Sequence, residues 1–298
     1  MCGIVGLLVK NPGLRDELGA LMVPMLVGMT ERGPDSAGLA VYTAPVPESE
    51  HKLSLYSGTQ AVDWPELLAE LKEELTQSQS IAINGNHAVL TTATEPARVG
   101  AWLQRNAPEV SVLSVGHSID LYKDVGAPAE IARRYRFESL AGTHLVGHTR
   151  MATESAVTPA HAHPFTAGRD FCLVHNGSLS NPHLVRKRLE PLGIEFETDN
   201  DTEAACRFFE WRLREGDDLE TAVERGFSEL DGFYTFLMGT ERELLIVRDA
   251  FACKPAVIAE TDDYVAIASE FRSLAHLPHI AHASLIEPKP EEIYSWHI

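Results

Sequence analysis

The chain opens with an apolar run, Cys2–Val9, which follows the initiator methionine directly and is rich in β-branched residues. A short, continuous apolar run of this kind predicts a buried β-strand. The strand would begin almost at the terminus of the chain, with Cys2 at its first position. Any fold for this sequence must therefore bury the N-terminal segment in a sheet.

The rest of the chain alternates strand-like runs with amphipathic helical patterns. Strands are predicted at Ser36–Thr43, Ala88–Ala93, Val110–Val115, His144–Thr149, Phe171–His175, Phe233–Met238, Leu244–Val247, Ala256–Glu260, Val265–Ala268 and Glu291–Ile298. Helices are predicted at Leu14–Arg32 (kinked or divided by Pro24), Asp63–Gln77, Arg98–Asn106, Pro182–Leu192, Thr202–Glu215 and Leu219–Leu230. Many strands with clustered helices between them favour stacked sheets covered by helices, an α+β architecture.

Residues from about 46 to 140 differ from their surroundings. A polar, proline-punctuated stretch at 44–50 leads into two strands separated by a helix, which predicts a small βαβ unit. This unit has no glycine-rich phosphate-binding loop, since both GxGxxG and GxxxxGK[ST] are absent. We interpret the segment as a structural insertion.

Charge and hydropathy exclude several classes of partner. The 298 residues contain 25 basic and 43 acidic side chains, a formal net charge of −18. Such a surface repels phosphate backbones and anionic lipids, so we expect neither nucleic acid nor a membrane as partner. No apolar run approaches the ~20 residues of a membrane span, and no basic segment precedes Cys2–Val9 as a secretory signal requires. We expect a cytoplasmic protein.

The four cysteines, Cys2, Cys172, Cys206 and Cys253, are widely separated. Without a CxxC pair they argue against iron–sulfur clusters, zinc ribbons and a disulfide framework. Cys2 is distinctive because removal of Met1 would leave it with both a thiol and a free α-amine, whose reference pKa values are about 8.5 and 7.7–8.0. One residue would then supply a nucleophile and a base. The alternative is that Cys2 is a small hydrophobic residue that starts a strand.

Four further motifs follow in order along the chain. They are Arg32-Gly33-Pro34-Asp35-Ser36-Ala37-Gly38, Gly147-His148-Thr149-Arg150-Met151-Ala152-Thr153, the pair His163-Pro164-Phe165 and Phe171-Cys172-Leu173-Val174-His175-Asn176-Gly177, and Asp201-Thr202-Glu203. Together with Cys2-Gly3-Ile4, this set resembles the class II glutamine amidotransferases, whose glutaminase domains use an N-terminal cysteine. Arg248-Asp249, Pro255 and Ser269-Glu270 also fit the pattern. The resemblance covers the whole chain except roughly residues 46–140.

The resemblance implies one domain over residues 1–298, a four-layer αββα N-terminal-nucleophile hydrolase sandwich with an inserted small α/β segment. It also implies a reaction, the hydrolysis of L-glutamine to glutamate and ammonia through a thioester on Cys2. Donors for the carbonyl oxygen are then expected at the Asn176 side-chain amide and the Gly177 backbone N–H. Asn-Gly is also the sequence of a type I′ turn between strands, and the two interpretations are compatible.

The same resemblance places the substrate. Arg150 would hold the α-carboxylate, because a guanidinium matches a carboxylate bidentately. Asp201 would hold the α-ammonium, and Thr153 and His163 would line the glutamine pocket. The alternatives are a structural ion pair for Arg150 and helix N-capping for Asp201.

Arg32 and Asp35 match a loop that supports the nucleophile, so we expect structural roles for both. Met151 stands where many relatives carry tryptophan, so closure of the glutamine loop is expected to differ. His161-Ala162-His163, with His144, His148 and His175, lacks a carboxylate or cysteine at ligand spacing, and no metal site is expected.

Class II glutaminase domains feed ammonia to a synthase. The chain most resembles separately encoded amidotransferase subunits of glutamate-synthase-like complexes, including N-methylglutamate synthase. This implies an ammonia-accepting partner subunit that carries flavin and iron–sulfur centres, with no cofactor in this chain. Two alternatives remain, a freestanding amidohydrolase acting on a γ-glutamyl compound and a non-catalytic scaffold.

Overall fold

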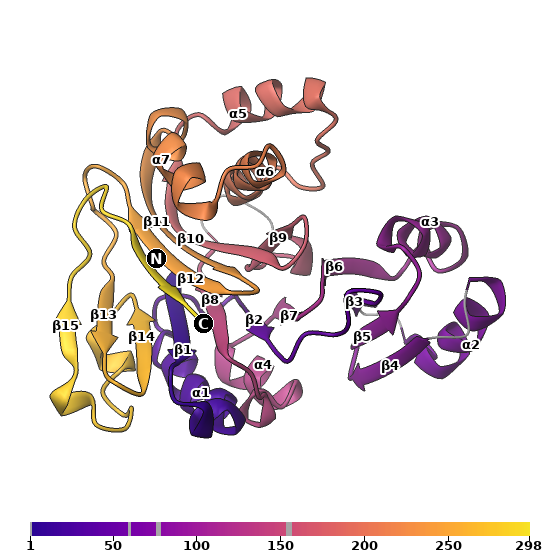
Figure 1. The fold of residues 1–298 in the computed structure, drawn as a ribbon, viewed down its shortest axis with the longest axis horizontal. Coiled ribbons are helices and arrows are strands. Elements are labelled where there is room, and N and C mark those ends of the chain that lie inside the picture. The colour runs from indigo at the N-terminus through magenta and orange to yellow at the C-terminus, as the bar shows by residue number, and fades with distance from the viewer. Residues whose placement is uncertain (1, 59–60, 76–78, 153–156) are drawn as a thin grey trace.

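The structure is a computed structural model that describes residues 2–58, 61–75, 79–152 and 157–298. Its strands form three sheets, and every strand pairing in these ranges is antiparallel. Two of the sheets stack on each other with helices outside them, while the third extends to one side (Figure 1). The fold is therefore the α+β sandwich that the sequence predicts, with an appended α/β unit.

The largest sheet has seven strands and contains the N-terminal strand in its middle. Its order is β15 (Ser284–Ile286), β13 (Val257–Glu260), β14 (Tyr264–Ala268), β1 (Gly3–Val9), β8 (His144–Arg150), β2 (Ser36–Tyr42) and β7 (Ile119–Val125). The side chains of β1 are buried on both faces of the sheet. This explains why Cys2–Val9 is a continuous apolar run and not an alternating one.

The second sheet has five strands. Its order is β16 (Tyr294–His297), β12 (Glu243–Arg248), β11 (Gly232–Thr240), β10 (Phe171–Leu179) and β9 (Phe165–Ala167). Ile4 and Leu8 of β1 point to this sheet and pack with Val174 and Leu237 in the core between the two sheets. The alternating residues of β1 point the other way, as the period of a strand requires.

Among the described residues, five helices form the two outer layers of the sandwich. They are α1 (Leu18–Gly28), α4 (Pro128–Arg134), α5 (Pro182–Leu189), α6 (Asp201–Arg214) and α7 (Leu219–Glu229). Helices α2 (Trp64–Glu74) and α3 (Pro96–Asn106) pack on the third sheet. Short 3-10 helices lie at Pro12–Glu17, Phe137–Ser139, Pro159–His161, Glu190–Leu192, Phe271–Ser273 and Ile280–His282. Helices α1 and α4 cover the outer face of the seven-stranded sheet, and α5, α6 and α7 cover that of the five-stranded sheet.

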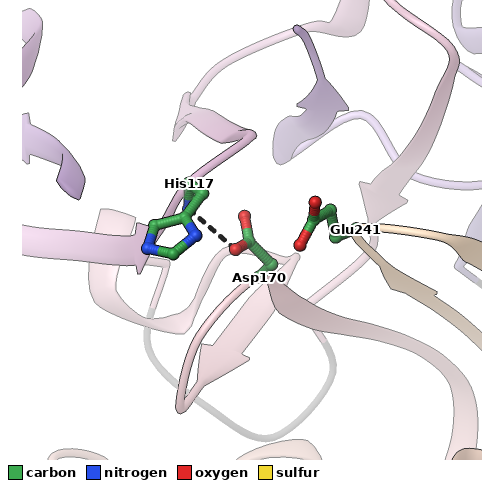
Figure 2. Close-up of side chains that lie close together, drawn as sticks. All are labelled: His117, Asp170 and Glu241. Atoms are coloured by element: carbon green, nitrogen blue, oxygen red, sulfur yellow. Dashed lines mark hydrogen bonds between the residues drawn. The ribbon is translucent and has the colours of Figure 1, made fainter. Parts of the chain in front are cut away.

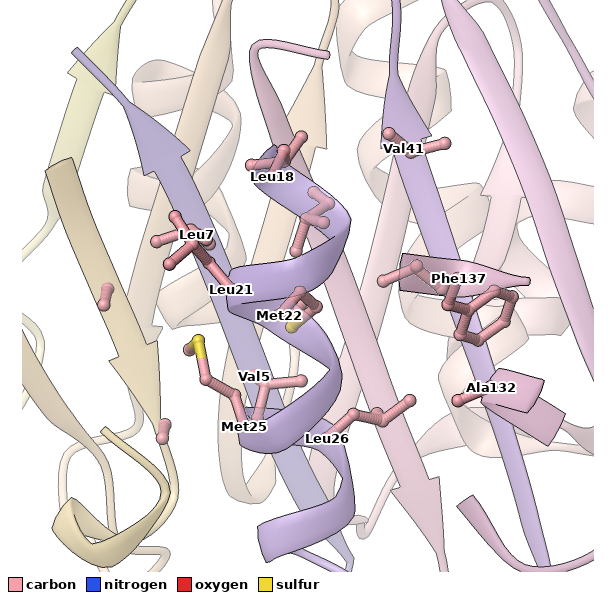
Figure 3. Packing of buried hydrophobic residues seen from close by; sticks show 14 of the residues in the cluster. Val5, Leu7, Leu18, Leu21, Met22, Met25, Leu26, Val41, Ala132 and Phe137 are labelled. Carbon is pink, nitrogen blue, oxygen red and sulfur yellow. The ribbon is translucent and has the colours of Figure 1, made fainter. Parts of the chain in front are cut away.

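Helix α1 packs directly over β1. Val5 and Leu7 of the strand meet Leu18, Met22 and other apolar side chains of the helix (Figure 3). The sequence predicts one helix over 14–32 kinked or divided at Pro24, whereas the structure has a 3-10 helix at Pro12–Glu17 followed by α1, with Pro24 inside it. Packing of this almost entirely apolar helix against the sheet outweighs the hydrogen bond that proline removes.

The third sheet has the order β4 (Gln79–Asn84), β5 (His87–Thr92), β3 (His51–Tyr56) and β6 (Ser111–Gly116). Strand β3 lies between β5 and β6 and pairs antiparallel with both, so the predicted βαβ unit is split by a strand that the sequence pattern did not reveal. Apolar residues of α2 and α3 form a separate small core on this sheet.

The segment from about 46 to 140 does not all belong to this third sheet. Strand β7 pairs with β2 along its full length, from Ser36 opposite Val125 to Tyr42 opposite Ile119. Helix α4 packs beside α1. Residues 119–140 are therefore part of the main sandwich, and the separate sheet ends at Gly116. No helix in the described ranges has the length and apolar character needed to cross a bilayer.

Candidate active site

Cys2 lies at the entrance to β1, half-buried, with its Sγ 4.0 Å from the carbonyl oxygen of Met151. Burial raises the pKa of the Cys2 thiol, and the positive charges of Arg150 and Arg32 offset this effect only in part. The resting thiol is thus protonated near neutral pH. Any reaction at this sulfur requires a base that removes its proton.

Arg32 holds the backbone of Cys2. Its Nε donates a 2.9 Å hydrogen bond to the Cys2 carbonyl oxygen, and its Nη1 donates one of 2.9 Å to Glu270 Oε1. The other oxygen of Glu270 forms a 2.7 Å ion pair with Arg272. Ile4, the second residue of β1, donates its N–H to Ser269 Oγ at 3.0 Å. Residues 269–272 therefore fix the position of the N-terminal segment.

Asp35 organises the end of β8. Its backbone N–H donates to the Arg150 carbonyl at 3.0 Å, and its Oδ2 accepts the N–H of Ala152 at 2.8 Å. Arg150 is the last residue of β8, is only 4% exposed and pairs with Ser36 across the sheet. Its guanidinium is close enough to influence the Cys2 thiol electrostatically. Thr153, predicted to line the glutamine pocket, lies outside the described residues.

Asn176 and Gly177 lie inside β10, opposite Thr235 and Tyr234 of β11. The interpretation of Asn-Gly as a turn between strands is therefore wrong. The Nδ2 of Asn176 is buried and, among the described residues, has no hydrogen-bond partner. A buried amide donor without a partner is costly unless something else accepts from it. This is the property expected of a donor that waits for a substrate oxygen.

Gly177 has a backbone conformation that only glycine adopts easily. Its φ is +150°, and a Cβ at this position would lie 1.9 Å from the carbonyl oxygen of Phe233. The pairing of β10 with β11 continues through this residue, in a conformation that glycine permits and other residues rarely adopt. Strand β10 faces β1 and β8 across the core between the sheets, so the two halves of the candidate site lie on facing strands.

Three buried histidines lie next to Asn176. His148 Nε2 is 3.1 Å from the carbonyl oxygen of His175, and the rings of His148 and His163 stack with centroids 4.0 Å apart. The hydroxyl of Thr202 lies 3.3 Å from His163 Nε2 and 3.0 Å from His175 Nδ1. Burial lowers the pKa of all three, that of His148 to about 3. They are neutral at physiological pH and serve as hydrogen-bonding groups.

Asp201 is the first residue of α6, and its neighbour Asn200 caps the helix by accepting the N–H of Thr202 at 2.9 Å. The N-cap alternative for Asp201 is therefore wrong. Its Oδ2 instead accepts the backbone N–H of Leu179 at 2.9 Å, and its Oδ1 lies 3.9 Å from His175 Nδ1. This leaves a partly exposed carboxylate at the end of β10, two residues beyond Gly177.

Two clusters in the described residues have the composition of metal ligands, and neither contains the histidines at 161 and 163. The first is His117, Asp170 and Glu241 (Figure 2), and the second is Glu220, Glu243 and His297. In the first, Asp170 already accepts the backbone N–H groups of residues 117–119 and the Ser118 hydroxyl at 2.7–2.9 Å. These bonds close the turn between β6 and β7, which accounts for the buried carboxylate.

The candidate residues thus form two groups. Cys2, Arg32, Asp35 and Arg150 surround the start of β1 and the end of β8. The second group lies on β10, α6 and the loop before β9, and consists of His163, Asn176, Gly177 and Asp201. A thiol, an unpartnered amide donor, a guanidinium and a carboxylate on these elements are the components for acyl transfer from a small zwitterionic amide.

Several supporting contacts are not evident from the sequence. Glu270 was noted only as part of a motif, and its contact with Arg32 was not foreseen. The contacts of His148 with the His175 carbonyl oxygen and of His175 with the Thr202 hydroxyl were also not predicted. The available signal was a histidine within each of two strand motifs, Gly147–Arg150 and Phe171–Gly177.

Comparisons with known proteins show the family of the chain. A family model for a glutamine amidotransferase domain matches residues 148–276. The chain is 46% identical over 297 residues to the glutamine amidotransferase-like protein GlxB of Rhizobium meliloti (strain 1021), covering 99% of this chain and 98% of that protein. It is 35% identical over 308 residues to a putative glutamine amidotransferase of Methanothermobacter thermautotrophicus, covering 99% of each.

A solved structure shows the same fold. The glutamine phosphoribosylpyrophosphate amidotransferase of B. subtilis, complexed with ADP and GMP, superposes with a TM-score of 0.62 at 18% identity. The match covers 99% of this chain and 49% of that one, so the chain spans about half of the length of this structural neighbour. The four-layer sandwich of the N-terminal-nucleophile class II amidotransferases is thereby confirmed.

Proposed function

The chain belongs to the glutamine amidotransferase family, and from this premise we propose that it hydrolyses L-glutamine to glutamate and ammonia at Cys2. The observation that carries the proposal is the buried Asn176 Nδ2, which has no partner in the described residues and directly precedes Gly177 with its positive φ. A structural asparagine would have its donor satisfied. A donor that stabilises an oxyanion has to stay free until the substrate arrives.

The proposed reaction begins once Met1 has been removed. The α-amine of Cys2 accepts the thiol proton, and the sulfur attacks the side-chain carbonyl carbon of glutamine. Negative charge on the carbonyl oxygen is stabilised by Asn176 Nδ2 and the Gly177 N–H. The proton returns to the departing nitrogen, the C–N bond breaks, and ammonia leaves a γ-glutamyl thioester.

Water then completes the turnover. It adds to the thioester carbonyl, loses a proton to the α-amine and displaces the Cys2 sulfur, which releases glutamate. Burial raises the pKa of the Cys2 thiol, so the proposed reaction needs a base that removes its proton. An amine with a pKa near neutral is well placed to remove its proton.

We assign the ends of the substrate to the two charged groups. Arg150, buried at the end of β8, pairs with the α-carboxylate, and the partly exposed Asp201 pairs with the α-ammonium. His163 is assigned to the pocket between these ends, and the resemblance assigns Thr153, which lies outside the described residues, to the same pocket. Arg32 and Asp35 act on the nucleophile and on Arg150 through backbone hydrogen bonds.

We further propose that the ammonia is passed to an acceptor in a partner synthase subunit of the glutamate synthase or N-methylglutamate synthase type, in the cytoplasm. The flavin and iron–sulfur chemistry of such a complex would reside on the partner. Ammonia released into water is protonated and lost as a nucleophile, which favours a sheltered transfer. Purification of the chain from its host tests this, because a stoichiometric flavin-containing companion is expected and its absence would favour a freestanding amidohydrolase.

The glutaminase proposal is tested by measuring glutamate release from L-glutamine. Cys253 is an exposed free cysteine and provides a matched control. Cys253→Ala is expected to retain the wild-type rate, whereas Cys2→Ala is expected to lose it entirely. Equal glutamine hydrolysis by Cys2→Ala and wild type would overturn the assignment.

A further inference from the structure

A cleft of about 600 Å³ lies between the third sheet and the main sandwich. One wall is formed by β6, and the opposite wall by β9, by residues 158–160 and by the N-terminal part of α6. The volume is within the range of small-molecule binding sites. None of the described residues assigned to glutamine lines this cleft.

Two buried donors in the cleft have no hydrogen-bond partner in the described part of the chain. They are the Ser114 hydroxyl, on a side chain that is 3% exposed, and the Nε of Arg207. Buried polar groups in folded proteins are normally satisfied. Two such donors on opposite walls of one cleft indicate an acceptor that enters from outside.

Lys123 adds a buried positive charge to the same cleft. Its Nζ donates to the carbonyl oxygens of Ala162 at 2.9 Å and Pro164 at 3.4 Å, so one of its three hydrogens is left. Burial lowers the pKa of Lys123 to about 8, and no described carboxylate forms a salt bridge with it. The charges of Glu197 and Glu203 reach Lys123 only from beyond salt-bridge distance, so an anion that binds next to this buried ammonium stabilises it.

The two glutamates of the cleft, Glu197 and Glu203, form no direct hydrogen bond with Lys123 or Arg207. Glu203 accepts the Glu197 and Thr198 N–H groups and the Thr198 hydroxyl at 2.6–2.8 Å. Arg207 lies 3.8 Å from Glu197 and 3.9 Å from Glu203, beyond hydrogen-bonding distance. The charges of Lys123 and Arg207 balance those of the two glutamates, so a bound monoanion is tolerated better than a dianion.

The remaining lining is largely apolar. Val112 and Leu113 of β6 and Phe165 of β9 are among the lining residues, and the ring centroid of Phe165 is 5.0 Å from Lys123 Nζ. The cleft therefore offers donors for an acidic head group together with an apolar surface for a hydrocarbon or aromatic body.

We propose that this cleft binds a small organic acid, with its carboxylate held by Lys123, Arg207 and Ser114 and its apolar body against Phe165 and Val112. A carboxylate supplies the acceptors that the three donors lack. A phosphate ester of equal size would carry a second negative charge towards Glu197 and Glu203. Binding at this cleft is independent of the proposed glutaminase reaction.

Titration calorimetry of the full chain with 3-phenylpropionate, and with its uncharged amide 3-phenylpropionamide, tests the proposal. The acid is expected to bind at one site and the amide at least about tenfold more weakly, as expected for charge-assisted hydrogen bonds. Arg207→Gln should lower the affinity for 3-phenylpropionate by about tenfold, and Ser114→Ala should lower it by about fivefold. Phenyl phosphate should bind more weakly than the acid.

Two cleft variants and one variant outside the cleft show whether 3-phenylpropionate binds in the cleft or elsewhere on the protein. Cys2→Ala should bind 3-phenylpropionate as the wild type does, and thermal unfolding should show that both cleft variants remain folded. Equal binding of acid and amide, absence of binding by the acid, or binding that neither cleft variant changes would overturn the proposal.

Discussion

The guanidinium of Arg32 donates a 2.9 Å hydrogen bond to the carbonyl oxygen of Cys2, while its other end binds Glu270. Cys2 precedes the first paired residue of β1, so the sheet alone does not fix its backbone. The position of its sulfur therefore depends on the hydrogen bond from Arg32. The structure therefore couples the geometry of the proposed nucleophile to residues more than 200 positions away in the sequence.

Replacing Arg32 by lysine should reduce kcat for glutamine hydrolysis by about tenfold or more, because lysine cannot bridge Cys2 and Glu270 with two separate donors and the sulfur loses its alignment. Steady-state kinetics measures this. Arg272→Lys is the matched control, since Arg272 contacts Glu270 and Glu31 but not Cys2. If the two variants lose activity equally, the contact with Cys2 is not the cause.

Asn176→Leu should reduce kcat by about 10²–10³-fold with little change in KM, the effect of removing one oxyanion donor. The free energy of unfolding should stay within about 1 kcal/mol of wild type, because the Nδ2 that is removed has no partner among the described residues. Urea unfolding measures this second quantity. A large loss of stability with an unchanged kcat would indicate a structural asparagine.

Gly177→Ala should destabilise the protein by several kcal/mol and abolish activity. Its φ of +150° and the 1.9 Å approach of a Cβ to the Phe233 carbonyl leave no room for a side chain. Gly100→Ala in α3 is the opposite case, because a Cβ there meets nothing within 4 Å. It should stabilise the protein by about 0.5–1 kcal/mol. Equal effects at the two glycines would contradict the described backbone.

The free energy of unfolding should fall as the pH drops below about 6.5. Burial lowers the pKa of His144 and His148 to about 3 and of His87 to about 4, so between these values and 6.5 the unfolded chain binds more protons than the folded one. Each histidine contributes about 1.4 kcal/mol per pH unit well inside that window.

His144→Gln tests this linkage away from the proposed site. His144 stacks on Tyr42 and lies 2.8 Å from the Thr240 carbonyl oxygen, so the variant removes one titrating group. Urea unfolding at pH 7, 6 and 5 should show a loss of stability that is smaller than in wild type by about 1 kcal/mol per pH unit below pH 6. Parallel profiles would show that His144 is not buried in its neutral form.

Local sequence patterns were sufficient to predict much of the main sandwich. The strand from Cys2 to Val9 and the helix at 219–230 appear within a residue or two of their predicted bounds, because the first is a continuous apolar run and the second has a clear helical period. Strands β3 and β4 were not predicted, because polar residues interrupt their apolar runs. The position of β3 between β5 and β6 depends on pairing between distant segments, which no local pattern encodes.

In the candidate site too, local motifs were informative and contacts between distant segments were not predicted. The motifs indicated which residues carry chemistry, but they did not show that Asn176-Gly177 lies within a strand or that Asn200, and not Asp201, caps α6. Both facts depend on contacts with other elements, β11 in the first case and the end of β10 in the second. The functions assigned to these side chains remain predictions.

Intact-mass analysis after incubation with an electrophilic glutamine analogue is the sharpest test of Cys2 as the nucleophile. We expect a protein that lacks Met1 and gains one equivalent of label, which peptide mapping places on Cys2. Cys253→Ala should label like wild type and Cys2→Ala should not label at all. A protein that retains Met1, or a label that persists in Cys2→Ala, would show that Cys2 is not an N-terminal nucleophile.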